Sequence, residues 1–404
     1  MLTINTSIKK NNKFLTATIG CFLRFPLTKH NLAYASLLAR MQMNASLYFP
    51  TISQQKQELS ELYDLQFEVV PQLFGNQIVL SYIANFVEPL ELLDPNYTYE
   101  KIVEDLALII EHPSFDEKLV SISQQQLIAE YQEIMQEPEN IALDRFFRIW
   151  YQDNPDYADN FMGSISEISE ATVGKMKQFA DNLRSVPAVL IGLARDKKYL
   201  SKLLNEEFKY AGLLKEFAPK NTVIPPAKIL SSESEVANNL QSQLLLGYGY
   251  KQPIDFREQI VGLVLAQYLA GDQSSKLFVK VREQLGAAYA VEATNFANNS
   301  LFLINAGINK NQATEAIKII KDEMEQISSG KIDLDLLKQA KKSLVNIQKI
   351  GEDHENWQLA HLLRNELYPS RVEVDRIKTI KSISEKQIHN FAQNLFLNES
   401  YLLK

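Results

Sequence analysis

The sequence predicts an α+β protein made of two homologous domains, each an antiparallel β-sheet with helices packed on one face. Three observations support this prediction. The chain has 404 residues, which is long for one hydrophobic core and suits two domains of about 200 residues each. The predicted strands and helices of the first half recur in the same order in the second half, at an offset of about 223 residues. A polar segment with three prolines, residues 215–227, separates the two halves.

The first half is expected to begin with a strand and two helices. Residues 14–25 alternate β-forming and apolar side chains, as a strand does. Residues 30–43 place apolar side chains at helical spacing, and Thr51 is a candidate N-cap for a helix over 51–63. A two-residue turn at Gly75-Asn76 then joins two strands. The remaining elements predicted for this half are strands 66–70 and 78–86, helices 98–112, 116–135, 140–151 and 164–183, and strand 189–192.

The second half repeats this order after the segment with three prolines. Its turn at Asn298-Asn299 corresponds to the earlier turn at Gly75-Asn76, and each turn leads toward a long helix. Prolines resist both helix and central strand, so we place the domain boundary in this segment, giving domains 1–217 and 228–404. The elements predicted here are strand 238–250, helix 256–270, strands 289–296 and 300–308, helices 311–328, 333–347, 352–367 and 385–395, and strand 400–403.

Composition and charge restrict the class of protein. Hydrophobic residues make up 46% and charged residues 23% of the chain, which excludes disorder as a description of its bulk. The net charge of −7 argues against a general nucleic-acid binder. Cys21 is the single cysteine, so no intrachain disulfide forms and we expect a reduced cytoplasmic setting. The apolar stretch 14–26 is interrupted by Arg24, is too short to span a membrane and lacks a cleavage site for a signal peptidase.

The stretch 274–289 joins an apolar helix to a predicted hairpin. It reads Ser275-Lys276-Leu277-Phe278, then Arg282-Glu283, then Gly286-Ala287-Ala288-Tyr289. Arg282 is expected on a short helix and Tyr289 at the start of a strand, so rigid elements would hold both polar groups. On these residues alone, structural roles are favoured, with Arg282 paired to an acidic neighbour and Tyr289 packed under the sheet.

This stretch resembles the C-terminal-domain signature of the pitrilysin/insulinase-type zinc peptidases, which include the processing peptidases. The duplicated architecture extends the resemblance over nearly the whole chain and implies the metalloprotease-LuxS-like fold. In that family zinc is held by His-x-x-Glu-His on the first helix and by a later Glu, and the motif Glu deprotonates the zinc-bound water. The resemblance also implies that Arg282 and Tyr289 hold substrate and stabilise a developing oxyanion.

The zinc motif itself is missing from this chain. None of the five histidines forms His-x-x-Glu-His. The alignment with the family places Ser36 and Arg40 where the two histidines would stand and Ala39 at the position of the general base. Ala39 cannot transfer a proton, and Arg40 puts a permanent cation near the metal position. Glu130 falls either at the later ligand position or on an exposed helix surface, and one carboxylate cannot hold zinc. We therefore expect no metal or cofactor in this chain and no activity of the chain alone.

A member that lacks the zinc motif but keeps Arg282 and Tyr289 resembles the non-catalytic subunit of a heterodimeric processing peptidase. The resemblance implies a zinc-bearing homologous subunit as partner, with zinc in that partner, and a peptide or protein substrate processed in a bacterial-type pathway. A homodimer that mimics the heterodimer stays open. The alternative is a structural or peptide-binding scaffold with the peptidase fold and no hydrolytic role. A stand-alone zinc peptidase would require stoichiometric zinc in the purified protein.

Overall fold

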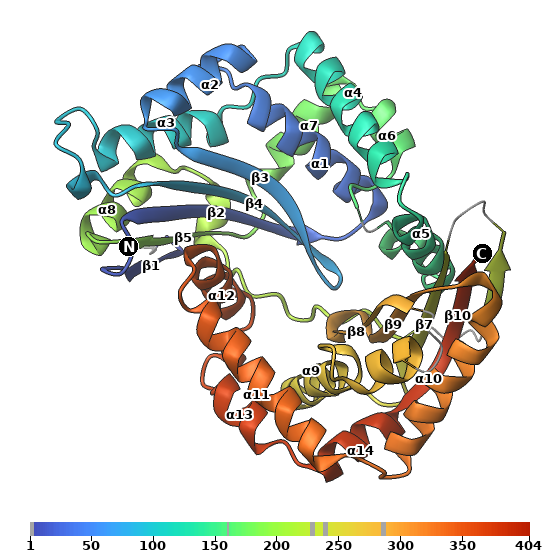
Figure 1. The fold of residues 1–404 in the computed structure, drawn as a ribbon. Helices are drawn as coiled ribbons and strands as arrows, with labels where there is room; N and C mark the ends of the chain where they lie inside the picture. Colours follow the sequence, from blue (N-terminus) through green and yellow to red (C-terminus); the bar gives the residue numbers. More distant parts are fainter. Residues whose placement is uncertain (1–3, 160, 227–230, 237–240, 284–287) are drawn as a thin grey trace. The chain divides into compact units, whose positions relative to one another are not determined.

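The computed structural model describes residues 4–159, 161–226, 231–236, 241–283 and 288–404, without the side chains of 282–290. The chain forms two compact units (Figure 1). Unit 1 contains Met1–Gln132, Asp159–Thr222 and Glu352–Ser370, and unit 2 contains Glu133–Ala158, Val223–Gly351 and Arg371–Lys404. Each unit therefore includes one segment from the other half of the sequence. The proposed domain boundaries, 1–217 and 228–404, describe the duplication along the chain and remain a prediction.

Unit 1 is built on a five-stranded sheet with strand order β1-β5-β2-β4-β3. Its strands are β1 (Thr6–Lys10), β2 (Thr16–Pro26), β3 (Gln66–Phe74), β4 (Gln77–Val87) and β5 (Ala188–Ala194). Its helices are α1 (Lys29–Asn44), α2 (Ile52–Glu61), α3 (Tyr99–Glu111), α4 (Glu117–Ile134), which ends just beyond the unit, α6 (Ile165–Ser169), α7 (Val173–Leu183), α8 (Lys197–Glu207) and α12 (Glu355–Leu367). All strand pairs are antiparallel except β1 with β5 at one edge.

Both faces of the unit 1 sheet are covered, which explains why strand β2 is buried along nearly its whole length. On one face, the hydroxyl of Tyr82 on β4 donates to the Gln42 side chain of α1 over 2.7 Å. Helix α12 lies on the other face (Figure 1), and its leucines belong to the same apolar cluster as Phe22, Val79 and Ile191. The β3–β4 hairpin closes at Gly75-Asn76 as predicted, and Gly75 has a φ of 61°, which glycine adopts without strain.

Unit 2 has a second five-stranded sheet, with strand order β6-β10-β7-β9-β8. Its strands are β6 (Ser231–Glu235), β7 (Ser242–Tyr250), β8 (Ala288–Phe296), β9 (Leu301–Ile308) and β10 (Leu395–Leu403). Its helices are α5 (Pro138–Trp150), α9 (Phe256–Ala270), the π-helix η4 (Phe278–Glu283), α10 (Ala313–Ser328), α11 (Leu334–Gly351), α13 (Arg376–Ser382) and α14 (Glu385–Asn394). The parallel pair is again at an edge, between β6 and β10.

The two sheets have the same topology, which confirms the predicted α+β class and its duplication. The order β1-β5-β2-β4-β3 becomes β6-β10-β7-β9-β8 when each strand is replaced by its counterpart in the repeat. In unit 2, α9, α10 and α14 contribute to the main core, and α5 packs on the opposite face of the sheet. Gly247 permits that second contact, because a Cβ there would lie 2.6 Å from the Phe146 ring and 2.8 Å from the Trp150 ring.

Each sheet differs from the prediction in detail. One edge pair is parallel, and one helix covers the face that was expected to be open. The predicted helix 164–183 is two helices, α6 and α7, and strands β1 and β6 were not predicted. None of the helices described here has the length and apolar character that crossing a membrane requires.

Candidate functional site

Helix α1 carries the three positions that the resemblance assigns to the zinc motif. The helix begins after Thr28, whose side-chain oxygen accepts a hydrogen bond of 3.0 Å from the backbone N–H of Asn31. Ser36, Ala39 and Arg40 follow at spacings of three and four residues, so they lie on one side of the helix. Ser36 and Ala39 are buried, and the Arg40 side chain is 28% exposed.

Arg40 forms an ion pair with Glu130 of helix α4. Its Nη2 donates a hydrogen bond to Oε2 of Glu130, whose side chain is 45% exposed. One turn later in α1 and one turn earlier in α4, Nδ2 of Asn44 donates to Oε1 of Gln126 over 2.8 Å. The two contacts advance in opposite sequence directions, so α1 and α4 run antiparallel at this point. The structure thus brings together Arg40 and Glu130, two of the positions that the alignment singled out.

The residues at these positions do not fit a zinc ion. Zinc requires neutral imidazole, thiolate or carboxylate ligands, and Arg40 presents a permanent positive charge instead. Glu130 already accepts a hydrogen bond from that guanidinium, and the buried Ser36 hydroxyl is neutral. Across the part of the chain that the structure describes, no group of three or more His, Cys, Asp or Glu side chains is arranged to hold a metal. These side chains therefore support no zinc-dependent reaction step.

The stretch 274–289 lies in unit 2 and begins with a tight turn. The Ser274 hydroxyl donates to Oδ1 of Asp272 over 2.6 Å, and the Ser275 hydroxyl donates to the Asp272 carbonyl over 2.6 Å. Leu277 and Val281 are fully buried and fix the following helix to the core. That helix, η4, has π geometry, which is rare in proteins and is frequent at functional sites.

Two further features hold this stretch in place. The Lys280 ammonium forms an ion pair with Glu323 of α10, and the Glu323 side chain is 1% exposed. Strand β8 pairs Ala288 with Ile308 and then Ala290 with Gly307, so Tyr289 is the extra residue of a β-bulge. Bulges redirect the side chain of the extra residue and are common beside active sites.

The predicted roles of Arg282 and Tyr289 lie beyond what the structure describes. The backbone of Arg282 belongs to η4 and that of Tyr289 to β8, but their side chains are outside the described part of the molecule. The intervening residues 284–287 are outside it as well. Substrate binding by these two side chains therefore stays a prediction.

Cys21 is a structural thiol. It is completely buried in strand β2, and burial raises the pKa of the thiol far above its ordinary value, with the charge of Glu111 adding to the effect. A nucleophilic cysteine needs a lowered pKa and an accessible sulfur. Cys21 has neither property, which agrees with its position among apolar side chains.

The sequence alone did not identify two features of these sites. The ion pair between Lys280 and Glu323 joins residues far apart in the chain, and only their opposite charges hinted at it. The contact between Arg40 and Glu130 depends on how α1 packs against α4. The alignment placed both residues at ligand positions, but no property of the sequence predicted that they form an ion pair.

Comparisons with known proteins agree with the fold and with the missing motif. Residues 190–344 match the family described as the Peptidase M16 inactive domain. The chain is 24% identical over 232 residues to an uncharacterized zinc protease of Rickettsia felis, and that match spans 57% of this chain and 55% of the relative's length. It is 21% identical over 417 residues to a Bacillus subtilis protein named "Probable inactive metalloprotease YmfF", which covers 99% of this chain and 96% of that protein.

A solved structure reproduces the whole fold. The crystal structure of a conserved protein from Enterococcus faecalis V583 has a TM-score of 0.89 at 20% identity, and the match covers 99% of this chain and 96% of that one. The matched family segment 190–344 includes the stretch 274–289. Residues 190–344 therefore match the inactive domain of the M16 peptidases, and over nearly its whole length the chain is similar to a protein named as an inactive metalloprotease; its own sequence lacks His-x-x-Glu-His.

Proposed function

We propose that this chain is the non-catalytic subunit of a two-chain peptidase. In this proposal a zinc-bearing homologue supplies the metal and the general base. This chain supplies half of a peptide-processing chamber and presents Arg282 and Tyr289 to a peptide or protein substrate.

The ion pair between Arg40 and Glu130 carries this proposal. A guanidinium at a ligand position repels a divalent cation, and its carboxylate partner is no longer free to bind one. Ala39 provides no group that could deprotonate water. At the positions of the zinc motif, the chain therefore offers neither the ligand set nor the general base of a zinc peptidase.

The described parts of the stretch 274–289 support a role for Arg282 and Tyr289 in the shared site. A π-helix, the ion pair of Lys280 with the buried Glu323, and a β-bulge at Tyr289 constrain the backbone that carries Arg282 and Tyr289. Hydrogen-bond donors held in fixed positions where negative charge develops accelerate acyl transfer by about 100-fold or more. A constrained backbone suits such a role, because the donors then need no reorganisation during the reaction.

The test mixes the purified chain with M16 homologues that carry His-x-x-Glu-His and measures cleavage of a fluorogenic peptide library. We expect cleavage only from the mixture, and a decrease of about 100-fold with Arg282→Ala or Tyr289→Phe. Arg257→Ala is the matched control, since Arg257 is an exposed arginine on α9 in the same unit. Full cleavage with both Arg282→Ala and Tyr289→Phe would exclude the shared-site proposal.

The alternative function, a peptide-binding or structural scaffold, gives a different outcome in the same experiment. A scaffold would form a stable complex with the homologue, and the complex would not cleave any peptide beyond the rate of the homologue alone. Light scattering of the isolated chain tests whether it also forms a homodimer, and metal analysis of the purified chain tests for zinc. A stoichiometric zinc content would contradict the proposal directly.

A further inference from the structure

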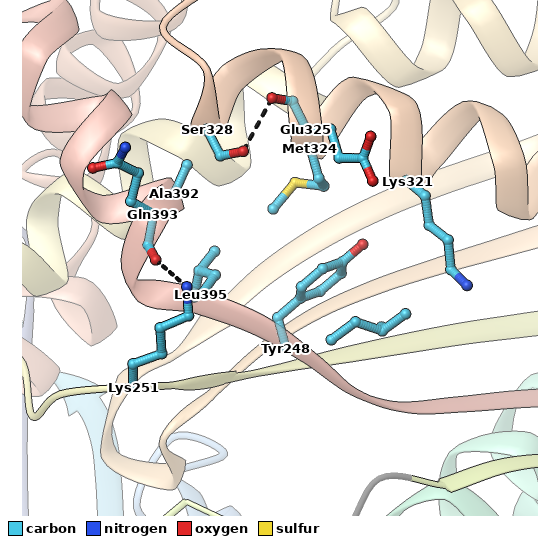
Figure 2. A pocket seen from close by; sticks show the side chains of 10 residues that line it. Tyr248, Lys251, Lys321, Met324, Glu325, Ser328, Ala392, Gln393 and Leu395 are labelled. Atoms are coloured by element: carbon cyan, nitrogen blue, oxygen red, sulfur yellow. Dashed lines mark hydrogen bonds between the residues drawn. The ribbon is translucent and has the colours of Figure 1, made fainter.

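A cavity in unit 2 lies between strands β7 and β10 and helices α10 and α14, and its volume is about 580 Å³ (Figure 2). One part of its wall is apolar and includes Met324, Leu395 and Leu397. The other part carries charged and polar side chains of α10, together with Lys251, which directly follows β7. A cavity of this size and mixed lining is typical of small-ligand sites.

Tyr248 of β7 contributes a hydroxyl group to this cavity that has no hydrogen-bond partner among the described residues. The residue is 5% exposed, and Figure 2 shows its ring extending from β7 toward α10. Other buried tyrosines in unit 2 are bonded: Tyr250 to Asn295, Tyr268 to Asp333 and Tyr401 to Glu235. Buried hydroxyls normally have partners, so the hydroxyl of Tyr248 is available to bond a ligand in the cavity.

The charges around the cavity favour an anion. The residues that line the cavity include two lysines, Lys251 and Lys321, and one glutamate, Glu325. Nζ of Lys251 donates to the Gln393 carbonyl over 2.6 Å, whereas Lys321 has no ion-pair partner within the described parts of the chain. Burial, and secondarily the charge of Glu325, raise the pKa of Tyr248 above its ordinary value, so its hydroxyl stays protonated and can donate.

We propose that this cavity binds a carboxylate attached to an apolar group. The Tyr248 hydroxyl and the Lys321 ammonium donate to the carboxylate, and Met324, Leu395 and Leu397 contact the apolar group. The carboxyl-terminal residue of a peptide and a free apolar acid share this chemistry. The site lies within one unit and requires no partner protein, so it is independent of the proposed function.

Isothermal titration of the full chain tests the proposal with three probes: N-acetyl-Leu-Leu as the free acid, the same dipeptide as its amide, and octanoate. We expect the acid to bind at least tenfold more tightly than the amide, because the amide lacks the negative charge that Lys321 attracts. Binding of the dipeptide acid identifies peptide ends as the source of the carboxylate. Binding of octanoate alone identifies free apolar acids, and either result supports a carboxylate site.

Two variants connect binding to the named side chains. Lys321→Met and Tyr248→Phe should each weaken binding of the acid by about tenfold. Lys318→Met is the matched control, since Lys318 is an exposed lysine on the same helix that does not line the cavity. Tyr248→Phe removes a hydroxyl without a partner, so its melting temperature should equal or exceed that of the unchanged protein.

Three results would overturn the proposal. These are equal binding of the acid and the amide, unchanged binding of the acid by Lys321→Met, and no heat of binding for either acid at millimolar concentration. A lower melting temperature of Tyr248→Phe without ligand would also count against it, because the hydroxyl would then have a structural partner. None of these outcomes depends on cleavage activity.

Discussion

Replacing Arg40 by methionine and Glu130 by glutamine, singly and together, measures how much their ion pair stabilises the protein. This pair lies where the resemblance places the zinc ligands. Both substitutions approximately preserve side-chain length while removing the charge. If the two side chains interact as the structure shows, the destabilisation by the double variant will be smaller than the sum of the two single effects. The difference is the coupling free energy between Arg40 and Glu130.

The expected magnitude follows from the exposure of the pair. Fully exposed pairs contribute about 0.2–1 kcal/mol, and hydrogen bonds to charged groups contribute about 1.5–3 kcal/mol. The side chains of Arg40 and Glu130 are 28% and 45% exposed, so the pair lies between these cases. We expect a coupling of about 1 kcal/mol, which shifts the melting temperature of a unit this size by about 2–4 °C. Salt should reduce the coupling, since part of each charge faces solvent.

Urea unfolding of the four proteins at low and high salt provides the measurement, with the transition of unit 1 followed separately where two transitions are resolved. Lys202 and Glu206 on α8 are the control pair, because their side chains are 65% and 55% exposed and their charged atoms lie 3.8 Å apart. We expect almost no coupling there. A coupling between Arg40 and Glu130 that is no larger than that of the control pair would refute the reasoning.

Two further predictions concern the buried carboxyl group of Glu399 and the positions of the missing zinc motif. Burial and a carboxylate on β6 raise the pKa of Glu399 to about 9, so its proton stabilises the fold and the free energy of unfolding decreases as the pH rises from about 4.5 to 9. Glu399→Gln should remove that decrease in urea unfolding at about pH 6 and pH 8, and an unchanged slope would contradict the assignment. The combined changes Ser36→His, Ala39→Glu and Arg40→His should create a zinc site with Glu130, measured by competition with a chromophoric chelator. Adding Glu130→Ala should weaken zinc binding at least tenfold.

Elements with strong periodicity could be predicted closely from the sequence. The predicted helix 256–270 coincides with α9, and the helix predicted over 98–112 is α3, Tyr99–Glu111. The turn at Gly75-Asn76 was predictable because its backbone requires a positive φ, which glycine provides. Local sequence determines these features, so no tertiary information was needed.

The missed strands depend on contacts between distant residues. Strand β1 pairs with β5 through Thr6 and Leu190, and β6 pairs with β10 through Ser231 and Glu399. Both strands have five residues, and the sequence of β6, SSESE, has no apolar residue at all. Nothing in such a segment indicates a strand until the neighbouring strand offers its free backbone groups. The same reason applies to the cavity at Tyr248, which exists only where α10 and α14 meet the sheet.

The ion pair at the positions of the zinc motif makes single substitutions toward a metal site destabilising. A guanidinium that is only 28% exposed needs a carboxylate to offset its lost hydration, and Glu130 supplies it. Arg40→His alone would leave Glu130 without that partner, and Ala39→Glu alone would place a carboxylate at a position that is 3% exposed. Each single step toward a metal site therefore costs stability before any metal can bind. The ion pair between Arg40 and Glu130 therefore stabilises the α1–α4 junction at the positions where the resemblance places the metal ligands.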